Sequence, residues 1–240
     1  MSLANPNRYE SIRCVLMDIE GTTTDIEFVH SVLFPYSAQH LPQYVMDHED
    51  DTTVQKCLLG VRQTLLDENE VTEAHTHTCI QALLHWIATD RKHTALKTLQ
   101  GLIWKTGYET GAYQSHVYPD VLPALQRWQA KGLTLAIYSS GSVAAQQLLF
   151  GHTPHGDLAP YFSHYFDTTV GGKKEMASYQ DIAKALALPP EAILFLSDME
   201  DELEAAEEAG FQVIQLQRDD NVISGHVPYP VKRSFDAILP

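Results

Sequence analysis

Apolar residues along the chain follow two kinds of pattern. Four short runs are apolar almost throughout and rich in strand-forming residues, which predicts strands buried on both faces of a sheet. These runs cover residues 12–18, 133–139, 192–197 and 211–216. Elsewhere apolar residues recur every three or four positions, which predicts amphipathic helices. The clearest examples are Ile80, Leu83, Leu84 and Ile87, followed by Leu96, Leu99 and Ile103.

Helical and strand patterns alternate after residue 117. Helices are expected over residues 122–131, from residue 142, and over 176–186 and 200–208, with a weaker strand at 165–170. Asp120 and Ser142 stand where N-cap residues are preferred. Strands separated by helices of ten to fifteen residues predict right-handed βαβ units and therefore a mostly parallel sheet.

The stretch between the first strand and this alternating region has a different character. Residues 25–116 show helical periodicity and no convincing strand pattern. We therefore expect an α/β fold with an open, Rossmann-like, mostly parallel sheet, built from residues 1–24 and 117–240. Residues 25–116 are expected to form an α-helical cap domain, inserted after the first strand.

Charge and composition narrow the possible functions. The 240-residue chain carries 31 acidic and 16 basic side chains, a formal charge of −15, which disfavours binding to nucleic acid or to an anionic membrane. No apolar run is long enough to cross a bilayer, and the first ten residues are too polar for a signal peptide. Three cysteines without a C-x-x-C pair are expected to be reduced thiols. These features predict a cytoplasmic location.

Polar residues gather where the predicted strands end. In an open parallel sheet, ligands bind beyond the carboxyl ends of the strands, so these residues are the candidates for a functional site. They are Asp18 and Glu20 after the first strand, Ser139 and Ser140 after the second, Lys173 after the weak strand, and Asp198 and Glu202 after a later strand.

The acids in this set favour a metal-assisted reaction on a phosphate. Asp18, Glu20 and Asp198 would repel one another without a cation, and a ligand set made only of oxygen atoms favours Mg²⁺. Strand alternation would place Asp18 and Glu20 on opposite faces, but a turn at Gly21 can direct both to one site. Asp18 can then attack phosphorus and form an aspartyl phosphate.

The remaining candidates suit the substrate. Ser139, the backbone N–H of Ser140 and the Lys173 ammonium can hold the phosphate oxygens. Each of these signals is weak by itself, and their order along the chain is what makes the set specific.

The ordered set resembles the haloacid dehalogenase superfamily of phosphotransferases in all four of its motifs. The run Asp18-Ile19-Glu20-Gly21-Thr22-Thr23-Thr24 departs from the usual pattern, because Glu20 stands where the superfamily has Asp. With Glu20 at this position, the run is similar to the corresponding motif of the enolase-phosphatase E1 family of the methionine salvage pathway. Residues 137–142, 149–152 and 195–198 are also similar to that family.

The resemblance implies a function and a role for each candidate. It implies enolisation of 2,3-diketo-5-methylthiopentyl-1-phosphate, a phosphorylated diketone, followed by dephosphorylation to an acireductone in a monomer with one Mg²⁺ per chain. Asp18 would be the nucleophile and a metal ligand, Glu20 the acid/base residue in contact with the metal, and Asp198 a further metal ligand. Ser139, Ser140 and Lys173 would bind the substrate and its phosphate, with Glu202 as a possible supporting acid. The run from Arg218 to Asn221 has no functional account at this level.

Other interpretations remain open from the residues alone. A generic Mg²⁺-dependent small-molecule phosphatase would use the same chemistry without enolisation, but Glu20 and the three threonines after Gly21 count against it. A metal-free dehalogenase does not need the cluster of acids. A non-catalytic relative would be expected to have lost Asp18, Lys173 or Asp198.

Overall fold

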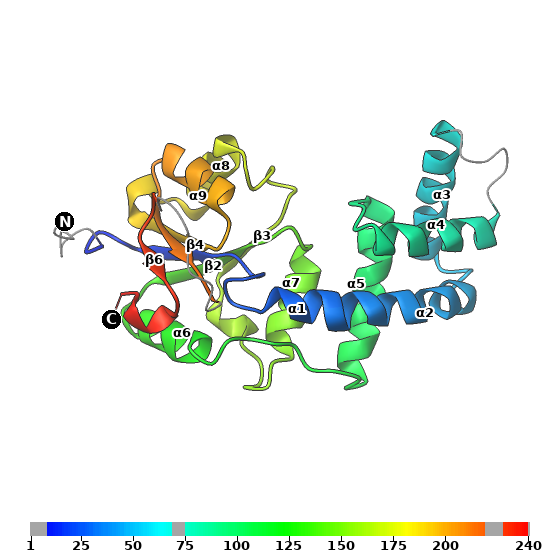
Figure 1. Cartoon of the computed structure of the whole chain (residues 1–240), viewed down its shortest axis with the longest axis horizontal. Helices are drawn as coiled ribbons and strands as arrows, with labels where there is room; N and C mark the ends of the chain where they lie inside the picture. The colour runs from blue at the N-terminus through cyan, green and yellow to red at the C-terminus, as the bar shows by residue number, and fades with distance from the viewer. Residues whose placement is uncertain (1–8, 69–74, 219–227, 240) are drawn as a thin grey trace. The chain divides into compact units, whose positions relative to one another are not determined.

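The computed structural model of the chain describes residues 9–68, 75–218 and 228–239. The chain divides into two compact units, one made of Met1–Ile26 with Ser115–Pro240 and the other of Glu27–Gln114 (Figure 1). The first unit combines strands and helices, and the described part of the second consists of helices and their connections.

A parallel sheet forms the centre of the α/β unit. The described residues give six strands in the order β3–β2–β1–β4–β5–β6. They are β1 (Cys14–Met17), β2 (Thr134–Tyr138), β3 (His164–Phe166), β4 (Ile193–Ser197), β5 (Gln212–Leu216) and β6 (Val231–Lys232). β1 lies between β2 and β4, where the strand order reverses direction. The predicted α/β fold with an open, parallel sheet is confirmed.

Helices cover both faces of this sheet, with α6 and α7 on one face and α8 and α9 on the other (Figure 1). Their bounds are α6 (Val121–Ala130), α7 (Val143–Gly151), α8 (Met176–Leu186) and α9 (Glu200–Glu208). Along β1, Val15 and Met17 belong to the core under α6 and α7, whereas Cys14 and Leu16 belong to the core under α8 and α9. Because side chains on both faces are buried, the whole strand is apolar, which explains the pattern in the sequence.

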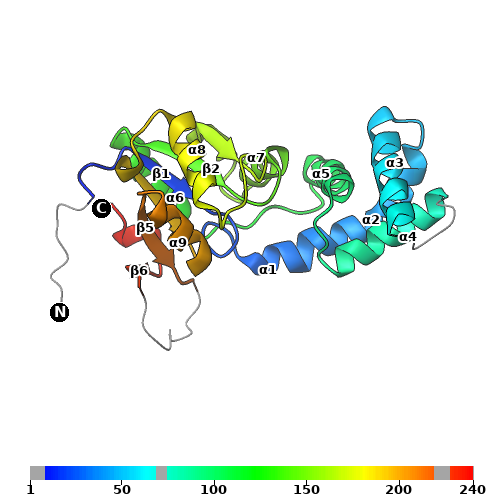
Figure 2. The same ribbon diagram turned by 90° about the horizontal axis from the view of Figure 1, so that it is seen from above.

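The second unit has its own helical core, and Figure 2 shows its helices from above. Its elements are α1 (Ile26–Phe28), which begins at the junction of the units, a π-helical turn (Val29–Leu33), α2 (Phe34–Asp47), α3 (Thr52–Asp67), α4 (Thr76–Ala88) and α5 (Thr94–Glu109). Six of the seven residues that predicted its helices are buried, and Leu84 is partly buried. Asp51 caps α3 by accepting hydrogen bonds from the N–H groups of Thr53 and Val54.

Three details of the predicted core differ from the structure. The strand expected over residues 165–170 ends at Phe166, because the Asp167 carboxylate accepts the N–H of Thr169 and closes a turn. β6 has only two residues and is too short for its pattern to stand out. Asp120 does not cap α6, since its carboxylate instead pairs with Arg218 and accepts the N–H of Phe235.

The cysteines agree with the prediction of reduced thiols. Cys14, Cys57 and Cys79 are buried free thiols, and burial raises the pKa of Cys14 to about 12. Such thiols are poor nucleophiles. Among the described residues, no helix has the length and apolar character needed to cross a membrane.

Two glycines of α5 differ in what surrounds them. A Cβ atom at Gly107 would lie 2.7 Å from Cε1 of Tyr113 and 2.8 Å from Cε1 of Tyr36, whereas at Gly101 it would meet no described atom within 4 Å. Alanine normally stabilises a helix by up to about 1 kcal/mol relative to glycine. We expect Gly101→Ala to raise the free energy of unfolding in urea by about 0.5–1 kcal/mol.

Gly107→Ala should lower that free energy by about 1–3 kcal/mol, because the two tyrosine rings have to move. Gly101→Ala is the matched control, since it changes the same atoms in the same helix. Equal stabilisation by the two exchanges would show that the rings do not restrict this position.

Candidate active site

Asp18 directly follows β1, at the carboxyl end of the central strand. Its N–H donates to the carbonyl of Leu196 (2.9 Å), so the pairing between β1 and β4 continues one residue beyond β1. The residue is only 2% exposed. Its backbone is therefore fixed at the point where the strand order reverses, which is the usual place for a ligand in such a sheet.

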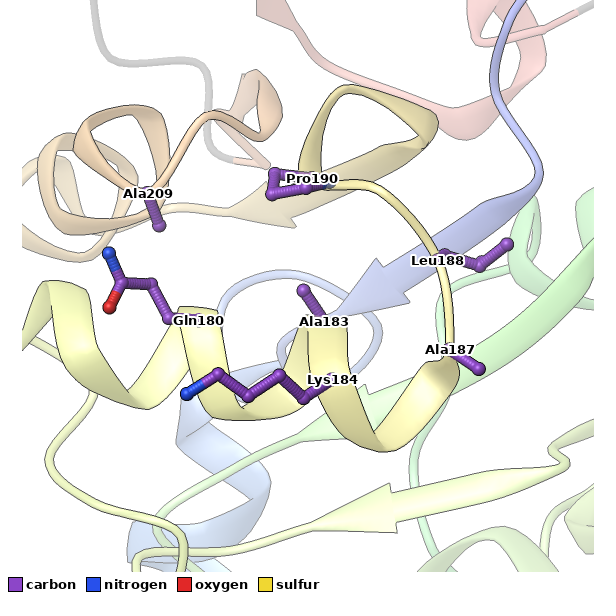
Figure 3. Close-up of a pocket in the computed structure, with 7 residues that line it drawn as sticks. All are labelled: Gln180, Ala183, Lys184, Ala187, Leu188, Pro190 and Ala209. Atoms are coloured by element: carbon purple, nitrogen blue, oxygen red, sulfur yellow. The ribbon is translucent and has the colours of Figure 1, made fainter.

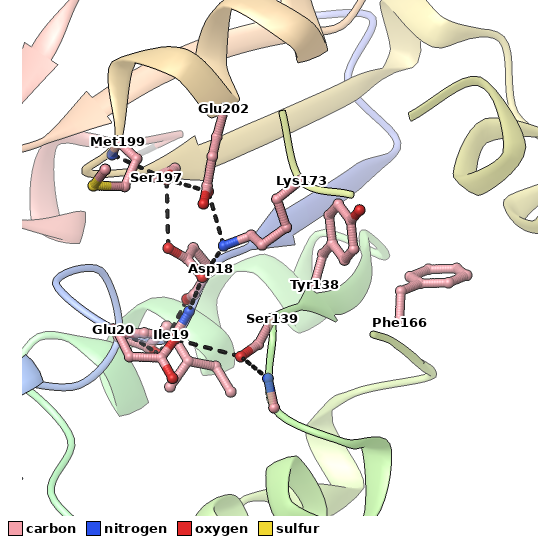
Figure 4. A network of polar contacts seen from close by, with 12 residues as sticks. Asp18, Ile19, Glu20, Tyr138, Ser139, Phe166, Lys173, Ser197, Met199 and Glu202 are labelled. Carbon is pink, nitrogen blue, oxygen red and sulfur yellow. Dashed lines mark hydrogen bonds and ion pairs between the residues drawn. The ribbon is translucent and has the colours of Figure 1, made fainter. Parts of the chain in front are cut away.

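Lys173 links two carboxylates at this position (Figure 4). Its Nζ lies 2.5 Å from Oδ1 of Asp18 and 2.8 Å from Oε2 of Glu202. Ser197, the last residue of β4, has its hydroxyl 2.9 Å from Oε2 of Glu202 and 3.4 Å from Oδ2 of Asp18. One ammonium and one hydroxyl group thus hold the two acids in a fixed arrangement.

The loop that carries Lys173 is held by hydroxyl groups from neighbouring elements. Tyr179 of α8 donates to the carbonyl of Lys173 (2.6 Å), Ser178 donates to that of Gly172 (2.8 Å), and Tyr138 of β2 donates to that of Gly171 (2.9 Å). These bonds fix three successive carbonyl groups. They explain how a lysine with four rotatable side-chain bonds is placed at a single position.

Lys174, the next residue, points elsewhere. It pairs with Asp201 (2.6 Å), and both side chains are more than 60% exposed. Exposed pairs of this kind contribute little to stability. The structure therefore brings Lys173, and not its neighbour, to Asp18.

A tight turn after Asp18 places Glu20. The carbonyl of Ile19 accepts the N–H groups of Thr22, Thr23 and Thr24, and Gly21 has a φ of +68°. A Cβ atom at Gly21 would collide with Oδ2 of Asp198, so the turn packs directly against that carboxylate. A glycine is needed here for both its conformation and its size.

Ser139 faces Glu20 from the end of β2 (Figure 4). Its hydroxyl lies 3.4 Å from Oε2 of Glu20 and accepts the N–H of Gly141 (3.1 Å). Ser139 is buried and Ser140 is exposed. The carboxylates of Asp18 and Glu20 thus have different partners, although they are only two residues apart.

Negative charge dominates the site. Burial and the neighbouring Asp18 carboxylate together raise the pKa of Asp198 to about 7, and the same two causes raise that of Glu202 to about 7 against the influence of Lys173. Burial, followed by Asp18, also raises the pKa of Glu20. Burial by itself would lower the pKa of Lys173, but Asp18 and Glu202 outweigh it and raise that pKa. Additional positive charge would relieve the repulsion among the acids.

A hard cation fits the donors next to the Gly21 turn. Buried Asp18 and half-buried Asp198 supply carboxylate oxygens that already interact electrostatically, and oxygen donors are what Mg²⁺ prefers. In the part of the chain that is described, no three side chains of His, Cys, Asp or Glu form a ready metal site by themselves. Main-chain oxygens and water would therefore have to complete the coordination.

Sequence reasoning missed two residues that the structure brings to this region. Ser197 contacts both Asp18 and Glu202, and its position directly before Asp198 at a strand end was the available signal. Arg218 donates two N–H groups to the carbonyl of Thr22, within the turn after Glu20. Arg218 belongs to the run, residues 218–221, for which the sequence suggested no function. Residues 219–221 of that run lie outside the described residues.

A separate groove lies between α8, the connection that leads into β4 and the end of α9 (Figure 3). It has a volume of about 320 Å³ and is lined mainly by apolar residues from α8, from the connection to β4 and from the end of α9. The lining includes Ala183, Leu188, Pro190 and Ala209. Its charged residue, Lys184, pairs with Asp181 (2.8 Å). That pair is exposed, so the groove does not hold a buried lysine between two acids as the site beside Asp18 does.

Comparison with known proteins agrees with this geometry. Residues 12–210 match the family of haloacid dehalogenase-like hydrolases. The chain is 52% identical to enolase-phosphatase E1 of Pectobacterium carotovorum over 209 residues, covering 87% of this chain and 90% of that protein. It is 48% identical to enolase-phosphatase E1 of Thioalkalivibrio sulfidiphilus over 229 residues, covering 94% and 98% respectively.

A solved structure extends the likeness to the fold. The crystal structure of the Unknown transcript 4 protein of Saccharomyces cerevisiae superposes with a TM-score of 0.77 at 33% identity, covering 95% of this chain and 100% of that one. Both the sequence and the fold therefore support one assignment. The chain belongs to the haloacid dehalogenase-like hydrolases and, within them, to the enolase-phosphatase E1 family.

Proposed function

We propose that this protein converts 2,3-diketo-5-methylthiopentyl-1-phosphate into the acireductone 1,2-dihydroxy-3-keto-5-methylthiopentene and inorganic phosphate. The observation that supports this most is the separation of two neighbouring carboxylates. Asp18 is held by Lys173, whereas Glu20 lies against Ser139. One acid is thus available for attack on phosphorus and the other for moving protons.

Glu20 would act in enolisation. It is partly exposed, so a bound substrate can reach it, and its pKa is raised, so it can exchange a proton more readily than an ordinary glutamate. It would remove a proton from the carbon next to a carbonyl group of the diketone. The electron pair of that C–H bond then forms the C=C bond of the enol, and the carbonyl oxygen becomes a hydroxyl group after protonation.

Asp18 would act in dephosphorylation. One of its oxygens attacks phosphorus, a P–O bond to the aspartate forms, and the P–O bond to the substrate breaks. Glu20 would protonate the leaving oxygen, and water then hydrolyses the aspartyl phosphate and regenerates Asp18. Lys173 would hold both Asp18 and a phosphate oxygen, while Ser139 and Ser140 would bind the substrate.

Asp18 and Asp198 would hold Mg²⁺, with Glu20 as a further contact. When bound, the cation offsets the negative charge of the phosphate and the surrounding acids. Glu202 would support the site by holding Lys173 in place, as its 2.8 Å ion pair suggests.

Two variants should separate the proposed steps. Asp18→Asn removes the nucleophile with little change in shape, so phosphate release should fall by several orders of magnitude while the substrate still exchanges its acidic C–H for deuterium. Glu20→Gln should slow both steps, by about 10²–10⁴-fold, because it removes the proton carrier. NMR of deuterium incorporation, run beside a phosphate assay, measures both.

Two other outcomes would contradict the proposal. Exchange at the wild-type rate in Glu20→Gln would show that another residue is the enolisation base. Wild-type protein that releases phosphate from many esters but does not enolise the diketone would be a generic phosphatase.

The two adjacent lysines should differ sharply in effect. Lys173→Ala removes a buried charge next to the phosphate position and should cost about 2–4 kcal/mol of transition-state stabilisation, measured as loss of kcat/KM. Lys174→Ala removes only an exposed ion pair and should leave kcat/KM unchanged. Equal losses in the two variants would mean that Lys173 has no special role in phosphate handling.

Removal of metal should abolish turnover. After dialysis against EDTA the protein should be inactive, and Mg²⁺ should restore activity. Ca²⁺ should compete with Mg²⁺ without supporting turnover, because its larger and looser coordination misplaces the phosphate. Full activity of protein shown by elemental analysis to be free of metal would rule out the proposed cation.

A further inference from the structure

Arg218 lies almost completely buried beyond the end of β5, with 7% of its side chain exposed. Its guanidinium donates from Nε (2.9 Å) and Nη2 (2.6 Å) to the carbonyl oxygen of Thr22, a residue that is itself fully buried. Nη1 pairs with Oδ2 of Asp120 (2.7 Å). One rigid, charged group therefore ties the turn after Glu20 to the residue before α6.

Two aromatic rings hold the guanidinium in place. Its carbon lies 4.4 Å from the ring centroid of Tyr118 and 4.6 Å from that of Phe235. Asp120, the ion-pair partner, is fixed in turn by the N–H of Phe235. A planar group held between rings, with its charge paired, has little freedom to move.

The turn itself has other tethers to the same segment. The N–H of Tyr118 donates to the carbonyl of Thr23 (3.0 Å), and Thr24 donates to the carbonyl of His116 (2.7 Å). Of the three threonines that are tethered in this way, Thr22 is the closest in sequence to Glu20. Its tether is the side chain of Arg218. Two N–H groups on one carbonyl oxygen also fix the orientation of that peptide plane, as a single donor does not.

We propose that Arg218 is a positioning residue for Glu20, because its grip on Thr22 sets the orientation of the Gly21–Thr24 turn. The inference rests on the proposed function, since it concerns where the acid/base carboxylate stands. The turn has to keep Gly21 against Asp198 and Glu20 against Ser139 at the same time. A shift of about 1 Å in such a group is sufficient to slow catalysis by about 100-fold.

Arg127 offers a matched control for the loss of structure. It also donates to main-chain carbonyls, those of Phe235 (2.8 Å) and Ile238 (3.3 Å), and it lies near the ring of Trp128. It therefore supports the turn at Phe235–Ala237, which also contacts Arg218, but these bonds do not reach the Gly21–Thr24 turn. Exchange of either arginine removes partly buried hydrogen bonds to main-chain carbonyls, whereas of these two exchanges only that of Arg218 releases Thr22.

The test compares Arg218→Lys with Arg127→Lys at a temperature well below both melting transitions. Lysine keeps the charge but lacks the planar fork that grips the Thr22 carbonyl. We expect Arg218→Lys to lower kcat by about 10- to 100-fold with KM changed by less than about threefold, because the substrate still binds while Glu20 is misplaced. Arg127→Lys should keep kcat within about twofold of the wild type.

A double variant shows whether Arg218 acts through Glu20. Adding Arg218→Lys to Glu20→Gln should lower kcat by less than about twofold further, since residues that act as one unit are not additive. Additive losses, a wild-type kcat in Arg218→Lys, or an equal loss in Arg127→Lys would overturn the proposal. The wild-type protein decides the proposed function separately. If it releases phosphate without enolising the diketone, the same comparisons of phosphate release still decide the role of Arg218.

Discussion

The ion pair between Lys173 and Asp18 is the interaction on which the rest of the site depends. Four carboxyl groups gather around a single buried ammonium, and each of the two acids that Lys173 touches would be strongly destabilised without it. A buried lysine left without its acids would be equally unfavourable. The pair can therefore exist only if the protein holds both partners rigidly, and much of the surrounding structure serves that purpose.

The parallel sheet fixes Asp18, and hydroxyl groups fix the loop that carries Lys173. β1 and β4 are neighbours, so Asp18 and Ser197 stand side by side at the same edge. Tyr138, Ser178 and Tyr179 then fix the loop of Lys173 by its carbonyl groups. Main-chain carbonyls make suitable anchors here, because a hydrogen bond to the backbone restrains the loop without competing for the lysine charge.

The parts of the fold that depend on local pattern could be predicted from the sequence. Strands buried on both faces leave an apolar run, and residues directly after such runs, among them Asp18 and Asp198, must lie at one edge of the sheet. α8 and α9 also cover the residues expected from the sequence, 176–186 and 200–208. The choice of Lys173, which lies next to Asp18 in the structure, followed from the family resemblance.

Features that arise from distant contacts were not visible in this way. Asp120 stands where a helix cap is expected, but Arg218, 98 residues away, provides a stronger partner. Only the folded chain brings the two together, and the same contact joins the turn after Glu20 to the segment before α6. The turn after Glu20 is therefore held partly by residues that lie outside the active site. A tight turn can direct Asp18 and Glu20 toward different partners, and the three N–H groups that donate to the Ile19 carbonyl close this turn locally. The contacts of Thr23 and Thr24 with residues 116–118 and the grip of Arg218 on Thr22 hold the turn from outside, and this is how a short loop can keep Glu20 and Gly21 next to Asp198.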